Sequence, residues 1–124
     1  MGTPRIVASA NPRTVLTKAV QRAAAFLGLN QRDLAAVLGS SEASISRLGK
    51  QRSLDPVSKE GELALLFLRA YRSLDAMVGG NTDQAREWFG AENQHLGGAP
   101  RLLVRSVAGL VATVQYLDAM RGRN

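Results

Sequence analysis

The sequence contains no cysteine and only one histidine, His95. Disulfide bonds, thiolate catalysis and cysteine-ligated metal sites are therefore excluded, and a single histidine does not form a metal site by itself. No run approaches the roughly 18 to 20 apolar residues that cross a bilayer, and the N-terminus lacks the basic and apolar regions of a secretion signal. We expect a cytoplasmic protein that needs no metal or other cofactor and does not enter a membrane.

Sequence motifs of catalysis are also missing. There is no Gly-x-Gly-x-x-Gly after a strand, no phosphate loop with Lys-Ser, no pair of carboxylates at a cleft and no nucleophile with its base. The pair Gly97-Gly98 is by itself a weak signal for phosphate binding. We predict that the protein acts by binding and is not an enzyme.

The formal net charge of +6 is unevenly placed. Residues 1–59 contain nine lysines and arginines against three acidic residues, whereas residues 60–124 contain seven of each sign. A positive field in the N-terminal half attracts a polyanion such as DNA, with binding that weakens as salt rises. The alternative is a solvated basic surface without a partner.

The N-terminal region predicts an arm followed by a helix. Residues 1–13 contain two prolines and no apolar period, which is typical of a flexible arm. A helix is expected from Thr14 to a stop at Gly28. Spacings of three and four residues predict that its buried face is formed by Val15, Ala19, Ala23 and Phe26.

Residues 31–48 fit the spacing of a helix-turn-helix. Small Ala35 lets two helices approach closely, Gly39 allows the turn between them, and Ser40 or Ser41 caps the second helix. The expected inward positions are Leu34, Leu38, Ile45 and Leu48. The stretch resembles the Xre-type repressors, although Ser40 stands where a branched apolar residue is usual. We place the N-terminal helix-turn-helix domain at residues 14–57.

The resemblance to Xre-type repressors implies a set of DNA contacts. In this motif the second helix enters the major groove. The side chains expected to face the bases are Ser41, Glu42, Ala43, Ser44 and Arg47. The side chains expected to hold phosphates are Gln31, Arg32, Lys50 and Arg52. The alternative is a structural platform that reads no DNA, because short Ser and Ala side chains distinguish bases poorly.

A strongly apolar helix is expected over residues 58–78. Ser58 supplies its N-cap, and apolar residues occupy more of its surface than a solvent-facing helix needs. Both apolar sides are buried either between two halves of one chain or against a second copy. We expect a homodimer, whose twofold symmetry matches that of an operator, and keep a central helix within a monomer as the alternative.

The remaining residues predict short helices separated by glycines. Pro100 suits the first position of one short helix, and Leu102 and Leu103 are expected to bury that piece. A last apolar helix begins at Ser106, and Gly109 allows its close approach to a neighbour. The fold class that follows is all-α, with a helix-turn-helix bundle and then a helical C-terminal unit over residues 58–124.

Residues 93–122 resemble the toxin-binding segment of the Xre/MbcA/ParS antitoxin family. The family pattern of Asn, Leu-Gly-Gly, Pro, paired Leu, Ser or Thr, Gly and terminal Gly is matched by Asn93, Leu96-Gly97-Gly98, Pro100, Leu102-Leu103, Ser106, Gly109 and Gly122. With the helix-turn-helix, the likeness spans essentially the whole chain. It implies an antitoxin that occludes the active site of a cognate RES-domain toxin, an enzyme that consumes NAD, and that represses its own operon.

The same resemblance implies which residues meet the toxin or shape the unit that meets it. They are Asn93, Leu96, Gly97, Gly98, Pro100, Leu102, Leu103, Met120, Arg121, Gly122, Arg123 and Asn124. Two other functions stay open. One is a plain helix-turn-helix transcription regulator whose C-terminal half only dimerises. The other is an adaptor that binds protein through the helix over residues 58–78 and never touches DNA.

Overall fold

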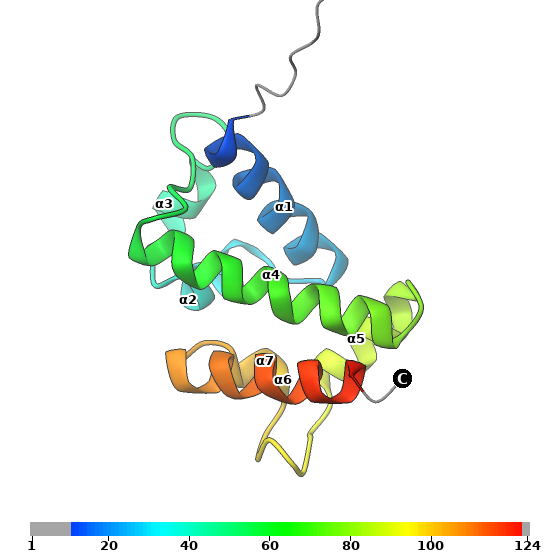
Figure 1. Cartoon of the computed structure of the whole chain (residues 1–124). Helices are drawn as coiled ribbons and strands as arrows, with labels where there is room; N and C mark the ends of the chain where they lie inside the picture. The colour runs from blue at the N-terminus through cyan, green and yellow to red at the C-terminus, as the bar shows by residue number, and fades with distance from the viewer. Residues whose placement is uncertain (1–10, 123–124) are drawn as a thin grey trace, which may run out of the picture.

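The computed structural model describes residues 11–122, which form seven helices (Figure 1). The helices are α1 (Pro12–Phe26), α2 (Gln31–Leu38), α3 (Glu42–Ser46), α4 (Lys59–Met77), α5 (Thr82–Gly90), α6 (Pro100–Leu103) and α7 (Val107–Arg121). No strand is formed in this range, so the all-α class is confirmed. Residues 1–10 of the arm predicted over residues 1–13, and the toxin contacts predicted for Arg123 and Asn124, lie outside the described residues. Residues 11–13 are not part of an arm, because they cap and begin α1.

Helix α1 begins two residues earlier than predicted. The side chain of Asn11 caps it by accepting a hydrogen bond from the backbone N–H of Arg13 at 2.8 Å, and Pro12 occupies the first turn. The predicted buried face is wrong at both ends, because Val15 is 52% exposed and Phe26 is 46% exposed. The buried residues are Leu16, Thr17, Val20, Ala23 and Ala24.

Thr17 explains why the buried face of α1 differs from the apolar pattern. Its hydroxyl donates to the backbone oxygen of Arg13 at 2.7 Å and accepts from the backbone N–H of Leu54 at 2.8 Å. A polar group with both partners is buried at little cost. The face centred on Thr17 therefore turns inward, and the face that carries Val15 and Phe26 remains at the surface.

The helix-turn-helix is formed as its spacing predicts. Asn30 and Asp33 exchange hydrogen bonds in a capping box at the start of α2, and Gly39 ends this helix in the left-handed region with φ of 68°. Ser41 caps α3, which is short and ends at Ser46. The four predicted inward residues Leu34, Leu38, Ile45 and Leu48 are all buried, as is Ala35.

Helix α4 crosses the molecule between α1 and α2 on one side and α7 on the other (Figure 1). Its buried residues include Leu63, Phe67 and Leu74, and the buried hydroxyl of Ser73 donates to Asp118 of α7 at 2.8 Å. Most of both apolar sides is thus covered within one chain. The apolar residues of α4 were one reason to expect a homodimer. Because the chain itself covers most of them, they do not by themselves require a second copy. Within the described residues no helix is long and apolar enough to cross a membrane.

Candidate functional site

The turn between α5 and α6 is built around Asn93. Its side-chain oxygen accepts from the backbone N–H of Leu96 at 3.0 Å, and its backbone oxygen accepts from those of Gly97 at 2.9 Å and Gly98 at 3.2 Å. Gly97 has φ of 81°, a conformation that favours glycine. Asn93 and the two glycines therefore act through backbone shape and present little side-chain surface.

Helix α6 places two leucines differently from the prediction. Leu103 is half-buried and lies against Gly98, where an added Cβ would be 3.4 Å from its side chain. Leu102 was expected to be buried but is 60% exposed. A single helical turn buries only one side, and Pro100 and Val104 form that side here.

Val107, at the start of α7, is the second exposed apolar residue of this region. It is 61% exposed, although it belongs to the apolar helix expected from Ser106. Leu102 and Val107 flank the short connection between α6 and α7. We call these two residues the α6–α7 corner. Both branched apolar side chains are accessible to a protein partner in the free chain.

The two helices of this corner are held close together by Gly109. A Cβ at this position would overlap the backbone oxygen of Leu103, so only glycine lets α7 start so near α6. Ser106 caps α7 by accepting from the backbone N–H of Gly109 at 3.0 Å. The close approach predicted for Gly109 is confirmed.

The predicted toxin-contacting residues fall into two separate groups. Asn93 to Leu103 lie together in the turn and α6, whereas half-buried Met120 and exposed Arg121 and Gly122 lie at the far end of α7 (Figure 1). Although the groups are apart in the sequence, the turn reaches the C-terminal half of α7, where the ring of His95 lies 5.7 Å from that of Tyr116. A partner can therefore meet both groups without covering the whole of α7.

Two arginines join helices α5 and α6 to the connection between α1 and α2. Arg101 of α6 donates to the carboxylate of Asp33 at 2.7 Å, and Arg86 of α5 donates to the backbone oxygens of Phe26 at 2.8 Å and Ala25 at 3.0 Å. These contacts fix α6 relative to the helix-turn-helix. Local sequence patterns contain no signal for them because their partners are 60 or more residues away.

The residues predicted to contact DNA lie mainly at the surface. Those exposed are Gln31, Arg32, Ser41, Glu42, Ala43, Arg47 and Lys50, and Ser44 is half-buried. The hydroxyl of Ser41 also serves α3, since it accepts from the backbone N–H of Ser44 at 3.1 Å. The first turn of α3 is thus both capped and accessible.

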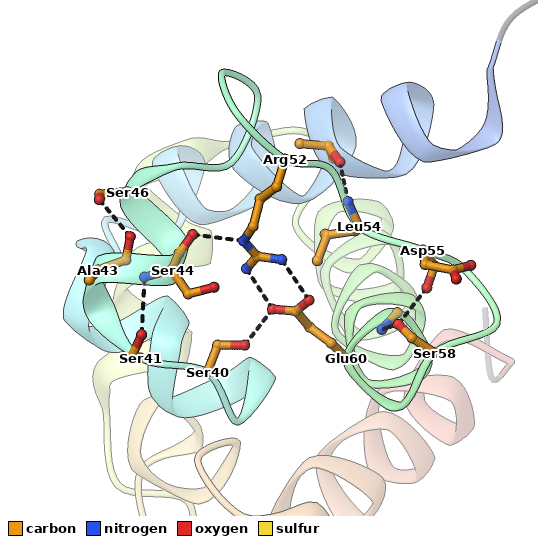
Figure 2. A network of polar contacts seen from close by, with 12 residues as sticks. Ser40, Ser41, Ala43, Ser44, Ser46, Arg52, Leu54, Asp55, Ser58 and Glu60 are labelled. Atoms are coloured by element: carbon orange, nitrogen blue, oxygen red, sulfur yellow. Dashed lines mark hydrogen bonds and ion pairs between the residues drawn. The ribbon is translucent and has the colours of Figure 1, made fainter.

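Arg52 differs from its predicted role in phosphate binding. Figure 2 shows its guanidinium facing Glu60 of α4, with hydrogen bonds of 2.9 and 2.8 Å to the two carboxylate oxygens. Its Nε donates to the backbone oxygen of Ser44 at 2.9 Å. Three of its five N–H donors are thus used inside the fold, so we do not propose Arg52 as a phosphate contact. It joins α3 to α4 instead.

Ser40 completes this network. Its hydroxyl donates to the same Glu60 carboxylate (Figure 2). This contact accounts for a serine where repressors of this type usually carry a branched apolar residue. Hydrogen bonds from Arg52 lower the pKa of Glu60 from its ordinary value, against the opposing effect of burial, and the hydrogen bond from Ser40 lowers it further. The hydrogen bonds to Glu60 and the charge of its carboxylate raise the pKa of Arg52, against the opposing effect of burial.

Replacing Glu60 with glutamine is expected to lower the free energy of unfolding by about 2 kcal/mol at neutral pH, because Arg52 loses its charged partner. The folded-state pKa of Glu60 is lowered, so its stabilisation is fully present above the unfolded-state pKa. It is lost as pH falls through the lower folded-state value. Denaturant unfolding of both proteins from neutral to acidic pH measures this difference.

The matched control is Glu62→Gln, which removes the same charge from an exposed pair with Lys59 on α4. Such exposed pairs contribute little. Equal effects of Glu60→Gln and Glu62→Gln, or a Glu60→Gln deficit that persists unchanged at acidic pH, would contradict the role given to the Arg52–Glu60 pair.

Comparison with known families covers nearly the whole chain. The Xre-like helix-turn-helix domain of antitoxins matches residues 7–69, and the C-terminal toxin-binding domain of Xre/MbcA/ParS antitoxins matches residues 73–123. Among curated proteins, none matches significantly. The α6–α7 corner lies within the second match and α2 and α3 within the first. The protein therefore belongs to the Xre family of antitoxins, non-enzymatic proteins that join a helix-turn-helix DNA-binding domain to a toxin-binding domain.

Proposed function

We propose that this antitoxin neutralises a cognate RES-domain toxin by covering the active site where that toxin consumes NAD. The observation that carries the proposal is the α6–α7 corner, where the toxin-binding domain presents Leu102 and Val107 to solvent. Both activities of the antitoxin, toxin binding and repression of its operon, take place in the cytoplasm, where NAD and operator DNA are present.

The α6–α7 corner has the properties of an interface centre. Leu102 and Val107 are mostly exposed in the free chain, so a partner that covers them removes apolar surface from water. Gly109 and the Asn93 turn hold the backbone on either side, which lowers the entropy lost on binding. A few such anchors usually provide most of the binding energy.

The end of α7 supplies the charged part of the proposed contact. Arg121 is exposed in the last turn of α7, about 20 Å from the corner along the helix axis. A guanidinium pairs well with carboxylates, so Arg121 is suited to the acidic groups of a cleft in the toxin. We propose that this end of the chain occludes the active site while the α6–α7 corner anchors the toxin.

Co-expression with a RES-domain toxin from the same operon tests the toxin-binding proposal. We expect a stable complex in size-exclusion chromatography with light scattering. Failure to associate would leave a helix-turn-helix regulator whose C-terminal half has another role. It would also remove the reason for assigning the α6–α7 corner to a RES-domain partner.

We propose that α2 and α3 bind operator DNA and thereby repress the antitoxin's own operon. Arg47 is exposed at the end of α3 and is suited to read guanine, while Lys50 is exposed in the following turn and is suited to hold a phosphate. Gln31 and Arg32 provide further phosphate contacts at the start of α2. The excess of basic residues before residue 60 supports this assignment.

Replacing Arg47 with alanine is expected to weaken binding to promoter DNA of the operon roughly tenfold to a hundredfold, with relaxed sequence preference. Lys50→Ala should weaken all sequences alike and reduce the salt dependence by about one counterion. The matched control is Arg105→Ala, which removes the same charge from an exposed position near the α6–α7 corner. Equal, small effects of the three variants would favour an adaptor that does not read DNA.

A further inference from the structure

A pocket lies between the first two turns of α1 and the loop that follows α3 (Figure 1). Its volume is about 330 Å³, at the lower end of the range for sites that hold small ligands. Thr14 and Lys18 line it from α1, and Lys50, Gln51 and Ser53 line it from the loop. We call it the α1–loop pocket. Neither the toxin-binding nor the DNA-binding proposal uses its α1 wall.

The α1–loop pocket has a positive lining. Lys18 and Lys50 belong to opposite walls, and no residue that lines the pocket is acidic. Of the chain's lysines, only Lys59 forms an ion pair within residues 11–122. Both lysines of the pocket therefore keep their donors for a ligand.

Carboxylates of the chain that could neutralise this lining are already paired. Asp55 and Glu60 are the first two acidic residues after the loop. Asp55 binds Arg13 at 3.1 Å, and Glu60 binds Arg52 at 2.8 Å. The positive charge of the pocket is thus left for an anion from outside the chain.

The loop wall also offers a backbone donor. The N–H groups of Lys50, Gln51 and Arg52 all donate to the backbone oxygen of Arg47. The N–H of half-buried Ser53 has no acceptor among residues 11–122. Because a half-buried N–H without a partner is costly, an anion in the pocket would be stabilised by it.

Both walls are fixed before any ligand binds. The side-chain amide of Gln21 donates to the backbone oxygen of Leu48 at 3.0 Å, and the N–H of Leu54 donates to the hydroxyl of Thr17 at 2.8 Å. These contacts tie α1 to both ends of the loop. Binding between fixed walls loses little conformational entropy. An anion there is attracted by two positive charges that otherwise repel each other.

We propose that the α1–loop pocket binds a phosphate group. A tetrahedral phosphate accepts hydrogen bonds from several directions at once, which suits donors on opposite walls. The group belongs either to the backbone of DNA or to a free phosphate compound. In the first case the pocket adds Lys18 to the DNA contacts proposed above. In the second it is a separate ligand site that does not rest on operator binding.

Titration of inorganic pyrophosphate into the ¹⁵N-labelled full-length chain tests the pocket. We expect the amide shifts to concentrate at Thr14 and in the loop up to Ser53. Lys18→Ala should weaken pyrophosphate binding about tenfold, because it removes one of two charged donors. Lys18 is exposed, so the remaining spectrum should show an unchanged fold. The matched control Lys59→Ala removes the same charge from an exposed position outside the pocket and should retain the affinity.

Two results of this titration would overturn the proposal. One is the absence of shifts localised to the pocket. The other is equal weakening in Lys18→Ala and Lys59→Ala, which would show only a general attraction of anions to a basic chain.

Binding to duplex promoter DNA at several salt concentrations identifies the source of the phosphate. A DNA phosphate predicts that Lys18→Ala reduces the salt dependence by about one counterion and that pyrophosphate competes with DNA. A free phosphate compound predicts that Lys18→Ala loses pyrophosphate binding while its DNA affinity stays at the wild-type value. Both results support the pocket. A wild-type chain that binds no DNA would contradict the operator proposal alone, because the pyrophosphate titration uses no DNA.

Discussion

Replacing Leu102 with aspartate is expected to weaken binding of the toxin, which we propose to be of the RES-domain type, at least about 100-fold. The side chain is 60% exposed in the free antitoxin, so the variant should fold normally. In the complex, a carboxylate at the centre of a dehydrated contact loses its water without gaining a partner. Titration calorimetry with purified toxin measures the change in affinity, and thermal unfolding of the free variant confirms that stability is retained.

The matched control for Leu102→Asp is Val57→Asp. Val57 is 91% exposed and lies in the loop before α4, outside the toxin-binding domain, so the same charge there should leave toxin affinity unchanged. Wild-type affinity for Leu102→Asp would show that the toxin does not cover the α6–α7 corner. Equal losses in both variants would point to a general effect of charge.

Gly109→Ala is expected to lower the free energy of unfolding by at least about 3 kcal/mol. Its Cβ would overlap the backbone oxygen of Leu103, and backbone on both sides of the connection must move to relieve the contact. The same movement displaces Leu102 and Val107, so toxin affinity should fall as well. Denaturant unfolding and toxin titration on one preparation measure both effects.

Gly90→Ala is the control for the change of residue type. Gly90 is the last residue of α5, and no atom lies within 4 Å of an added Cβ there. Alanine should be neutral or slightly stabilising because it has the better helix propensity. A Gly109→Ala protein as stable as Gly90→Ala would contradict the close approach of α6 and α7 on which the geometry of the corner depends.

Local patterns predicted the helix-turn-helix well. Ala35, Gly39 and the inward residues Leu34, Leu38, Ile45 and Leu48 occupy their expected places because the motif depends on contacts within eighteen residues. The same spacing argument failed for α1, where it predicted a buried face of apolar residues only. The decisive contact was a hydrogen bond that the backbone N–H of Leu54 donates to the hydroxyl of Thr17, and apolar periodicity contains no signal for it.

Contacts between distant residues account for most of the remaining differences. From the sequence, Arg52 has the charge and position of a phosphate-binding residue. The position of α4 in the fold shows that its guanidinium binds the carboxylate of Glu60 instead. Arg101 and Asp33 are likewise 68 residues apart. Leu102 was placed wrongly because a helix of four residues has no period from which a buried side could be predicted.

The toxin-binding assignment came from a different kind of signal. Neither composition nor spacing indicates that residues 93–122 bind a toxin, whereas their resemblance to the antitoxin family does. The match of the toxin-binding domain to residues 73–123 confirms the family. The structure adds what the pattern lacks, since Asn93 and Gly97 shape the backbone of the turn while Leu102 and Val107 are exposed.

The most direct test of this account is the rate of NAD consumption by the RES-domain toxin as full-length antitoxin is titrated into it. Occlusion of the active site predicts that activity falls to background at the stoichiometry of the complex. It also predicts that an antitoxin lacking residues 121–124 still associates through the α6–α7 corner but leaves much of the activity. Full NAD consumption by toxin saturated with the intact antitoxin would contradict neutralisation by occlusion.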